Sequence, residues 1–199
     1  MIFNKIQLYI LKKTKKFVKK YMNKINDISH DYNHIKLVIK YSLKIAKKEG
    51  VNDINELFII KMAALLHDIG DHKYTNKNQK KIINKLLNKF GKLRKDDKKE
   101  IIEIASNVSL SKEDNRKNKK LDIVKDADRI NSLGAIGILR YATYNVKNSE
   151  KPSFKEIISN LTNRTEKIKM NIKTTTGKKI AKKQLKIISK FLKNYKKFI

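Results

Sequence analysis

Apolar residues recur at spacings of three and four along almost the whole chain, whereas the alternating pattern of a half-buried strand is scarce. A spacing of three and four places side chains on one face of an α-helix. We therefore expect an all-α protein without an internal repeat. The expected helices cover residues 3–22, 30–48, 53–68, 76–90, 96–107, 121–131, 135–144, 153–173 and a last stretch from the turn at 174–177 to the C-terminus.

Residues that favour helix ends stand at several of these boundaries. Gly50 suits the end of the helix at 30–48. Asp53 and Glu56 have the spacing of a capping box, as do Ser153 and Glu156. Gly70 would let the chain turn sharply after the third helix. The polar segments 111–120 and 145–151 are expected to be loops.

The first helix is amphipathic, and residues 1–24 are expected to pack on the core or to form an appendage, with residues 25–199 as the main domain. Its broad apolar side is expected to carry Phe3, Ile6, Tyr9, Ile10, Phe17 and Tyr21. No linker divides the rest of the chain. There is no run of eighteen apolar residues and no signal-peptide core. We expect no membrane contact and a cytoplasmic protein, or one of the host cytoplasm if the source is a virus.

The chain carries 49 lysines and arginines and a formal net charge of +30, which is common in nucleic-acid-binding proteins. Only five of the basic residues are arginine, and lysine is spread along the whole chain. Lysine, asparagine and isoleucine are abundant together, as in proteins of AT-rich genomes. We therefore assign most of the charge to solvated surface, which would bind nucleic acid weakly at low salt. The absence of cysteine excludes a disulfide scaffold, a zinc finger and a cysteine nucleophile.

The stretch 63–71, Ala-Ala-Leu-Leu-His-Asp-Ile-Gly-Asp, joins a small apolar helical run to adjacent histidine and aspartate. His67 and Asp68 would be neighbouring metal ligands at the end of a buried helix; alternatively, His67 caps the helix C-terminus and Asp68 lies on the surface. His34 and Asp128, each on its own expected helix, favour the metal site. These four residues form a mixed nitrogen and oxygen set that suits an open site for Mn²⁺, Fe²⁺, Ni²⁺, Mg²⁺ or Zn²⁺. Asp126 points away from Asp128 on a helix, so only one of the two should reach the metal.

The order and spacing of these motifs resemble the HD-domain metal-dependent phosphohydrolase superfamily. The resemblance rests on residues 30–35 (HDYNHI), 63–74 (AALLHDIGDHKY), 107–112 (NVSLSK) and 125–140 (KDADRINSLGAIGILR). It implies an HD-domain helical bundle with His34, His67, Asp68 and Asp128 as metal ligands. The chain is similar to the bacterial single-domain HD hydrolases of its size, some of which are nucleotide pyrophosphohydrolases.

Asp71 falls where alarmone-hydrolysing HD enzymes carry an acidic residue after the HD pair. The resemblance therefore implies that Asp71, with Asp68, is catalytic and positions or deprotonates the attacking water, although Asp71 could instead be a turn residue. His30, four residues before His34, is expected to face the same side and to bind substrate phosphate, or else to lie in solvent at the helix start. Lys73, Lys125 and Arg129 are also expected phosphate contacts, with Arg129 alternatively pairing with Asp126.

Two positions depart from the superfamily pattern. Leu37 stands where many HD proteins have arginine, so that phosphate contact is missing or is supplied by Lys36. Asn107 stands where a two-metal HD phosphodiesterase would carry a further histidine, so one metal ion is expected.

The expected function is hydrolysis of a nucleotide phosphoester or phosphoanhydride bond by a metal-activated water, with one divalent ion, Mn²⁺ favoured, as cofactor. The expected partner is a small phosphorylated substrate, and the chain is expected to be a monomer or a homodimer. The alternative is a catalytically inactive HD scaffold that acts as a basic nucleic-acid-binding protein. Tight binding at physiological salt would favour that alternative.

Overall fold

The computed structural model describes residues 2–71, 75, 78–112 and 117–198, and this part of the chain is helical without a strand. The predicted all-α class is therefore confirmed. Two 3-10 turns, η1 (Ile28–His30) and η2 (Leu110–Lys112), accompany the α-helices. The α-helices are α1 (Lys5–Ile25), α2 (Tyr32–Lys48), α3 (Ile54–Leu66), α4 (Gln79–Leu87), α5 (Lys95–Ala105), α6 (Lys119–Asn131), α7 (Gly134–Asn148), α8 (Phe154–Asn171) and α9 (Thr175–Tyr195).

Helix α3 is the centre of the core because its sequence is apolar on every side. Nine of its thirteen residues are buried, and a helix that is hydrophobic all round needs neighbours on all sides. Helices α1, α2, α5 and α6 supply these neighbours. Its start is fixed by Asp53, whose carboxylate accepts the N–H of Glu56 at 2.8 Å, as the capping spacing predicts. The core therefore holds the end of α3, and with it His67, in a rigid position.

Helix α1 and the residues before it pack on the core in large part as expected, because Phe3 and Ile10 are buried and Phe17 and Tyr21 pack against the core. The buried stripe of the helix runs through Gln7, Ile10, Leu11, Thr14, Val18 and Met22, whereas Ile6 and Tyr9 are 42% and 56% exposed. Tyr21 is partly buried, and its hydroxyl accepts the N–H of Gly70 at 3.1 Å. The first helix thus supports the turn that follows α3.

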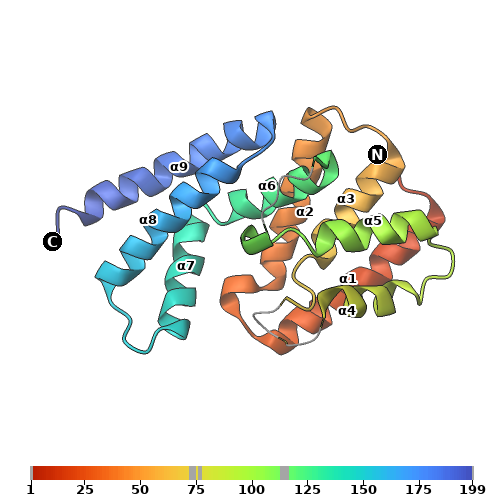
Figure 1. The fold of residues 1–199 in the computed structure, drawn as a ribbon, viewed down its shortest axis with the longest axis horizontal. Coiled ribbons are helices and arrows are strands. Elements are labelled where there is room, and N and C mark those ends of the chain that lie inside the picture. The colour runs from red at the N-terminus through yellow and green to blue at the C-terminus, as the bar shows by residue number, and fades with distance from the viewer. Residues whose placement is uncertain (1, 72–74, 76–77, 113–116, 199) are drawn as a thin grey trace.

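Helices α7, α8 and α9 gather at the end of the molecule opposite α1 and α4 (Figure 1). Helix α7 packs against both α8 and α9, and α9 also contacts α6 and α2. Helix α7 continues to Asn148, so the expected loop at 145–151 is wrong in its first half. The side-chain amides of Asn145 and Asn148 donate to carbonyls four residues earlier, at 2.8 and 2.7 Å.

The described helices include none that is long and apolar enough to cross a membrane. Gly70 has a φ of +73°, in the left-handed region, so the predicted sharp turn after α3 is confirmed. An added Cβ at Gly70 would lie 2.7 Å from the Cδ1 of Ile82 in α4, which explains why a glycine stands there.

Candidate metal centre

Three segments bring the four expected ligands together. His34 lies in the first turn of α2, where Asp31 caps the helix by accepting the N–H of His34 at 2.9 Å. His67 is the C-cap of α3, and its carbonyl accepts the side-chain amide of Gln79 at 2.6 Å. Asp68 follows in the turn, and Asp128 projects from α6.

The ligand atoms of these residues lie within contact distance of one another. The Nε2 atoms of His34 and His67 are 3.2 Å apart. Nε2 of His34 lies 3.3 Å from Oδ2 of Asp68 and 3.2 Å from Oδ1 of Asp128. Nε2 of His67 lies 3.3 Å from Oδ1 of Asp68 and 3.7 Å from Oδ1 of Asp128. Each imidazole therefore lies close to both carboxylates. The ligand atoms of His34, His67 and Asp68 all lie within 4.8 Å of one another, and Asp128 adjoins this group through its contacts with the two histidines.

The outer hydrogen bond of His67 fits metal binding through Nε2, whereas those of His34 do not in the present arrangement. Nδ1 of His67 lies 2.9 Å from the carbonyl of Ala64 and donates to it, so Nε2 keeps its lone pair for an ion. Nδ1 of His34 lies 2.6 Å from the side-chain amide of Asn131 and 2.8 Å from the guanidinium of Arg140. Both groups donate as they are placed, and a guanidinium can only donate, so Nδ1 of His34 is the acceptor and Nε2 carries the proton that faces the carboxylates. Ligation of an ion through Nε2 of His34 would therefore require a half-turn of the Asn131 amide and a shift of Arg140 away from the ring.

The two carboxylates of the cluster favour positive charge at its centre. Burial would lower the pKa of His34 and His67, but the carboxylates of Asp68 and Asp128 raise both, that of His67 to about 9. Burial would raise the pKa of Asp128, but hydrogen bonds with the two imidazoles hold it well below its ordinary value. Protons on the histidines thus balance the carboxylates, and a bound cation would displace those protons. A donor set of two imidazoles and two carboxylates fits a divalent ion.

Asp126 and Asp128 project to different sides of α6. The Asp126 carboxylate is fully buried and accepts the N–H of Lys173 at 2.9 Å and both the N–H and the hydroxyl of Thr174 at 2.7 Å. It fixes the start of α9 and lies away from the histidines. Asp128 alone of the two faces the cluster.

Two small hollows open at the cluster. One, of about 150 Å³, is lined by His67, Asp68, Asp71 and Asp128 together with Arg129 and Arg164. The other, of about 130 Å³, is lined by His34, Arg140, Tyr141, Tyr144 and again Arg164. Ser132 lines both hollows. We refer to the two hollows together as the cleft, which is lined by both carboxylates and arginines.

The expected catalytic and substrate residues fall at different distances from this cleft. Asp71 is buried and lines it beside Asp68. Arg129 lines it too, although its guanidinium also donates to the carbonyl of Asn171 at 2.6 Å and lies 3.9 Å from Asp126. Lys125 is 1% exposed and lines neither hollow. Lys73 and the side chain of His30 lie outside the described residues.

Sequence reasoning missed Arg140, Arg164 and Asn131. Arg140 reaches the His34 ring from α7, where its second amino group also lies 3.3 Å from Asp31. Leu37 leaves no cation on α2 at the superfamily position, and Arg140 brings one from another helix. A signal was present: three of the five arginines in this lysine-rich chain line the cleft.

Comparison with known proteins agrees with this arrangement. The HD-domain family model matches residues 31–133, which contain all four residues of the cluster. Protein L803 of Acanthamoeba polyphaga mimivirus is 30% identical over 141 residues, which cover 64% of this chain and 58% of L803. YpgQ of Bacillus subtilis is 30% identical over 118 residues, which cover 56% of this chain and 55% of YpgQ. The matched stretch thus spans little more than half the length of these curated relatives.

Solved structures share the fold over nearly the whole chain. An HD-superfamily hydrolase from Bacillus thuringiensis is 27% identical, with a TM-score of 0.74 and coverage of 96% of this chain and 97% of that one. YpgQ in complex with ADP is 22% identical, with a TM-score of 0.76 and coverage of 95% and 97%. The family model accounts for just over half of the chain and includes every residue of the histidine and aspartate cluster, so this chain belongs to the HD-domain family.

Proposed function

We propose that this chain is a divalent-metal-dependent phosphohydrolase that acts on a nucleotide. The observation that carries the proposal is the convergence of His34, His67, Asp68 and Asp128 at the edge of a cleft lined by arginines. The HD-superfamily hydrolase from Bacillus thuringiensis supports a hydrolase of this fold.

His34, His67, Asp68 and Asp128 would hold one divalent ion, for which Mn²⁺ is the favoured candidate because the set mixes nitrogen and oxygen donors without thiolate. A divalent ion bound there would lower the pKa of an attacking water and polarise the P–O bond. The hydrogen bond from His67 to the Ala64 carbonyl fixes the tautomer that such a ligand needs.

Asp71 is the proposed proton acceptor. Its carboxylate lines the same hollow as Asp68 and Asp128, so a water between them and the substrate phosphorus is within its reach. As the water oxygen forms its bond to phosphorus, the bond to the leaving oxygen breaks and the water proton passes to Asp71. Asp68, which lines the same hollow, would help to orient the water.

Arginines on three helices would hold the phosphate oxygens. Arg129 comes from α6, Arg140 from α7 and Arg164 from α8, and each lines at least one hollow. A guanidinium can donate two parallel hydrogen bonds to a phosphate, which stabilises the charge that develops on its oxygens. The guanidinium of Arg164 also lies 5.5 Å from the ring centre of Tyr141, so its plane is held beside the cleft.

A nucleotide suits this cleft better than a simple phosphate ester. Tyr141 and Tyr144 line the hollow next to His34, where they could cover a base or sugar. YpgQ, which shares the fold, was crystallised with ADP. Both observations favour a substrate that carries an aromatic base besides its phosphates.

The proposal is tested by a screen of nucleoside mono-, di- and triphosphates with Mn²⁺, in which phosphate and pyrophosphate release are measured separately. We expect release from at least one nucleotide that stops on chelation of the metal and in His67→Ala. Release that survives both changes would contradict the assignment of this site.

A further inference from the structure

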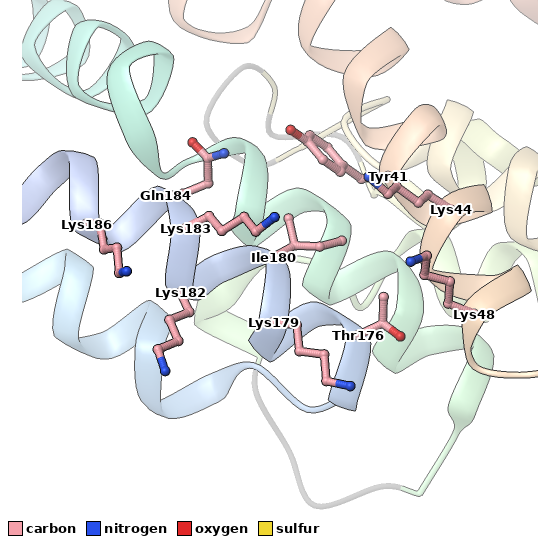
Figure 2. Close-up of a pocket in the computed structure, with 10 residues that line it drawn as sticks. All are labelled: Tyr41, Lys44, Lys48, Thr176, Lys179, Ile180, Lys182, Lys183, Gln184 and Lys186. Carbon is pink, nitrogen blue, oxygen red and sulfur yellow. The ribbon is translucent and has the colours of Figure 1, made fainter.

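A large hollow lies away from the metal centre, between α2 and α9. It has a volume of about 870 Å³, and six lysines stand among its ten lining residues: Lys44, Lys48, Lys179, Lys182, Lys183 and Lys186. Lys44 and Lys48 of α2 extend toward α9, while Lys179 and Lys183 of α9 extend toward α2 (Figure 2). We refer to this hollow as the lysine groove.

The charge of the groove is concentrated beyond the chain average. Lysine is fewer than one in four residues of the sequence but more than half of the groove lining, and no acidic residue lines it. No ion pair joins any of these six lysines to an acidic side chain in the described part of the chain. The expectation that lysine is merely spread over the surface therefore misses a local concentration.

One carboxylate stands at the end of the groove. Glu49 accepts the N–H of Thr176 at 2.7 Å, and this hydrogen bond, with the charges of Lys119 and Lys179, lowers the pKa of Glu49. It is therefore already engaged at the start of α9. The remaining lysines of the groove keep a strong positive field that an anionic ligand could neutralise.

A second, smaller hollow extends the positive surface across α9. It has a volume of about 430 Å³ and shares Lys182 and Lys186 with the lysine groove. It adds Lys178, and also Lys169, whose Nζ is paired with the Glu166 carboxylate at 3.2 Å. Lys182 and Lys186 therefore border both hollows.

The groove is separate from the metal centre. None of the described residues that line it also lines the two hollows at the histidine and aspartate cluster. His34 stands in the first turn of α2 and Lys48 at its last residue, so about 20 Å of helix separates them at 1.5 Å per residue. The anion bound in the groove would be distinct from the substrate at the metal.

We propose that the lysine groove binds the phosphate backbone of a single nucleic-acid strand. Lys44 and Lys48 of α2 and Lys179 and Lys183 of α9 extend toward each other, which suits a chain of phosphates lying between them, while Lys182 and Lys186 extend away from α2 (Figure 2). Tyr41 and Ile180, both half-buried, line the same groove, and an aromatic or apolar surface between cations is typical of sites for single strands. Lysines without arginines predict binding that does not depend on base sequence.

The test compares two triple variants that lose the same charge. Lys44→Ala, Lys179→Ala and Lys183→Ala together remove charge from the groove. The control combines Lys12→Ala, Lys16→Ala and Lys19→Ala, which are exposed on α1. Binding of a fluorescent 20-nucleotide single strand is measured by anisotropy over a range of salt, with the same-length duplex and inorganic polyphosphate as competitors. Hydrolysis of a small nucleotide is measured in parallel.

We expect the groove variant to bind the strand roughly tenfold or more weakly at physiological salt, with a salt slope smaller by about 2 for three lost contacts. The control should bind within about twofold of wild type with an unchanged slope, since diffuse charge contributes little at that salt. Hydrolysis should stay unchanged in both variants. An equal loss of binding in both, no strand binding by the wild type, or preferential displacement by duplex or polyphosphate would overturn the proposal.

Discussion

Replacing Asp126 with asparagine separates the structural aspartate of α6 from the proposed metal ligand two residues later. The Asp126 carboxylate accepts three hydrogen bonds, two on Oδ2 from Thr174 and one on Oδ1 from Lys173. An asparagine has one oxygen, so its amide NH₂ must face at least one of these donors. If the asparagine oxygen keeps the two bonds from Thr174, its NH₂ faces the partly buried N–H of Lys173, which then loses this acceptor.

The expected cost follows from these contacts. A buried donor left unsatisfied costs about 1–3 kcal/mol, and the surviving bonds weaken because they lose their ionic acceptor. Burial raises the pKa of Asp126 because desolvation disfavours the charged carboxylate. A neutral amide avoids this desolvation cost, which offsets part of the destabilisation. The net destabilisation should be about 2–3 kcal/mol, or roughly 4–12 °C in the melting temperature of a domain of this size.

The assay combines urea unfolding, followed by circular dichroism, with calorimetric titration of Mn²⁺ into each folded variant. Asp126→Asn should lose the predicted stability but bind Mn²⁺ with an affinity within a few-fold of wild type. Asp128→Asn should lose Mn²⁺ binding, because it removes a carboxylate from the cluster. Stability of Asp126→Asn within about 0.5 kcal/mol of wild type, or loss of Mn²⁺ binding there and not in Asp128→Asn, would refute the reasoning.

The metal-free protein should lose stability as pH rises from 6.5 to about 9. Burial would lower the pKa of His67, but neighbouring carboxylates raise it to about 9. The protonated imidazole therefore contributes its full stability below pH 6.5 and loses it between pH 6.5 and about 9. Urea unfolding midpoints measured with a chelator over this pH range should show the loss, and His67→Gln should make stability less dependent on pH. Gly70→Ala should destabilise the fold by about 1–2 kcal/mol because of its positive φ, whereas Gly91→Ala, where an added Cβ meets nothing within 4 Å, should be nearly neutral in the same assay. Arg164→Ala should raise KM for the nucleotide about tenfold, because it removes a proposed phosphate contact. Arg94→Ala removes an exposed charge and should leave KM unchanged in the same kinetic measurement.

Local features of the fold were predictable because they depend on neighbours in sequence. Ser153 accepts the N–H of Glu156 at 3.2 Å, at the spacing read from the sequence, and Gly70 makes its turn. The buried face of α1 was predictable only in part. Ile10 is buried and Phe17 and Tyr21 pack against the core as expected, but packing against α3 also buries Leu11 and Val18 and leaves Tyr9 exposed.

The residues of the candidate site were likewise predictable only in part. The four expected ligands could be named because their motifs, in this order, resemble those of the HD superfamily, which implies that they meet. Arg140 contacts a histidine 106 residues earlier, and Asn131 contacts the same ring from 97 residues away. Such contacts depend on how α6 and α7 pack against α2, which periodicity does not specify. The rarity of arginine in this chain was the available signal.

The most direct test of the central claim is nucleotide hydrolysis by metal-free protein to which Mn²⁺ is added back, with wild type and Asp128→Asn side by side. The predicted result is that wild type regains phosphate or pyrophosphate release in proportion to one bound ion per chain, while Asp128→Asn stays inactive at the same metal concentration. Full activity in the metal-free wild type, or equal activity in Asp128→Asn, would contradict the claim that this cluster is the catalytic metal centre.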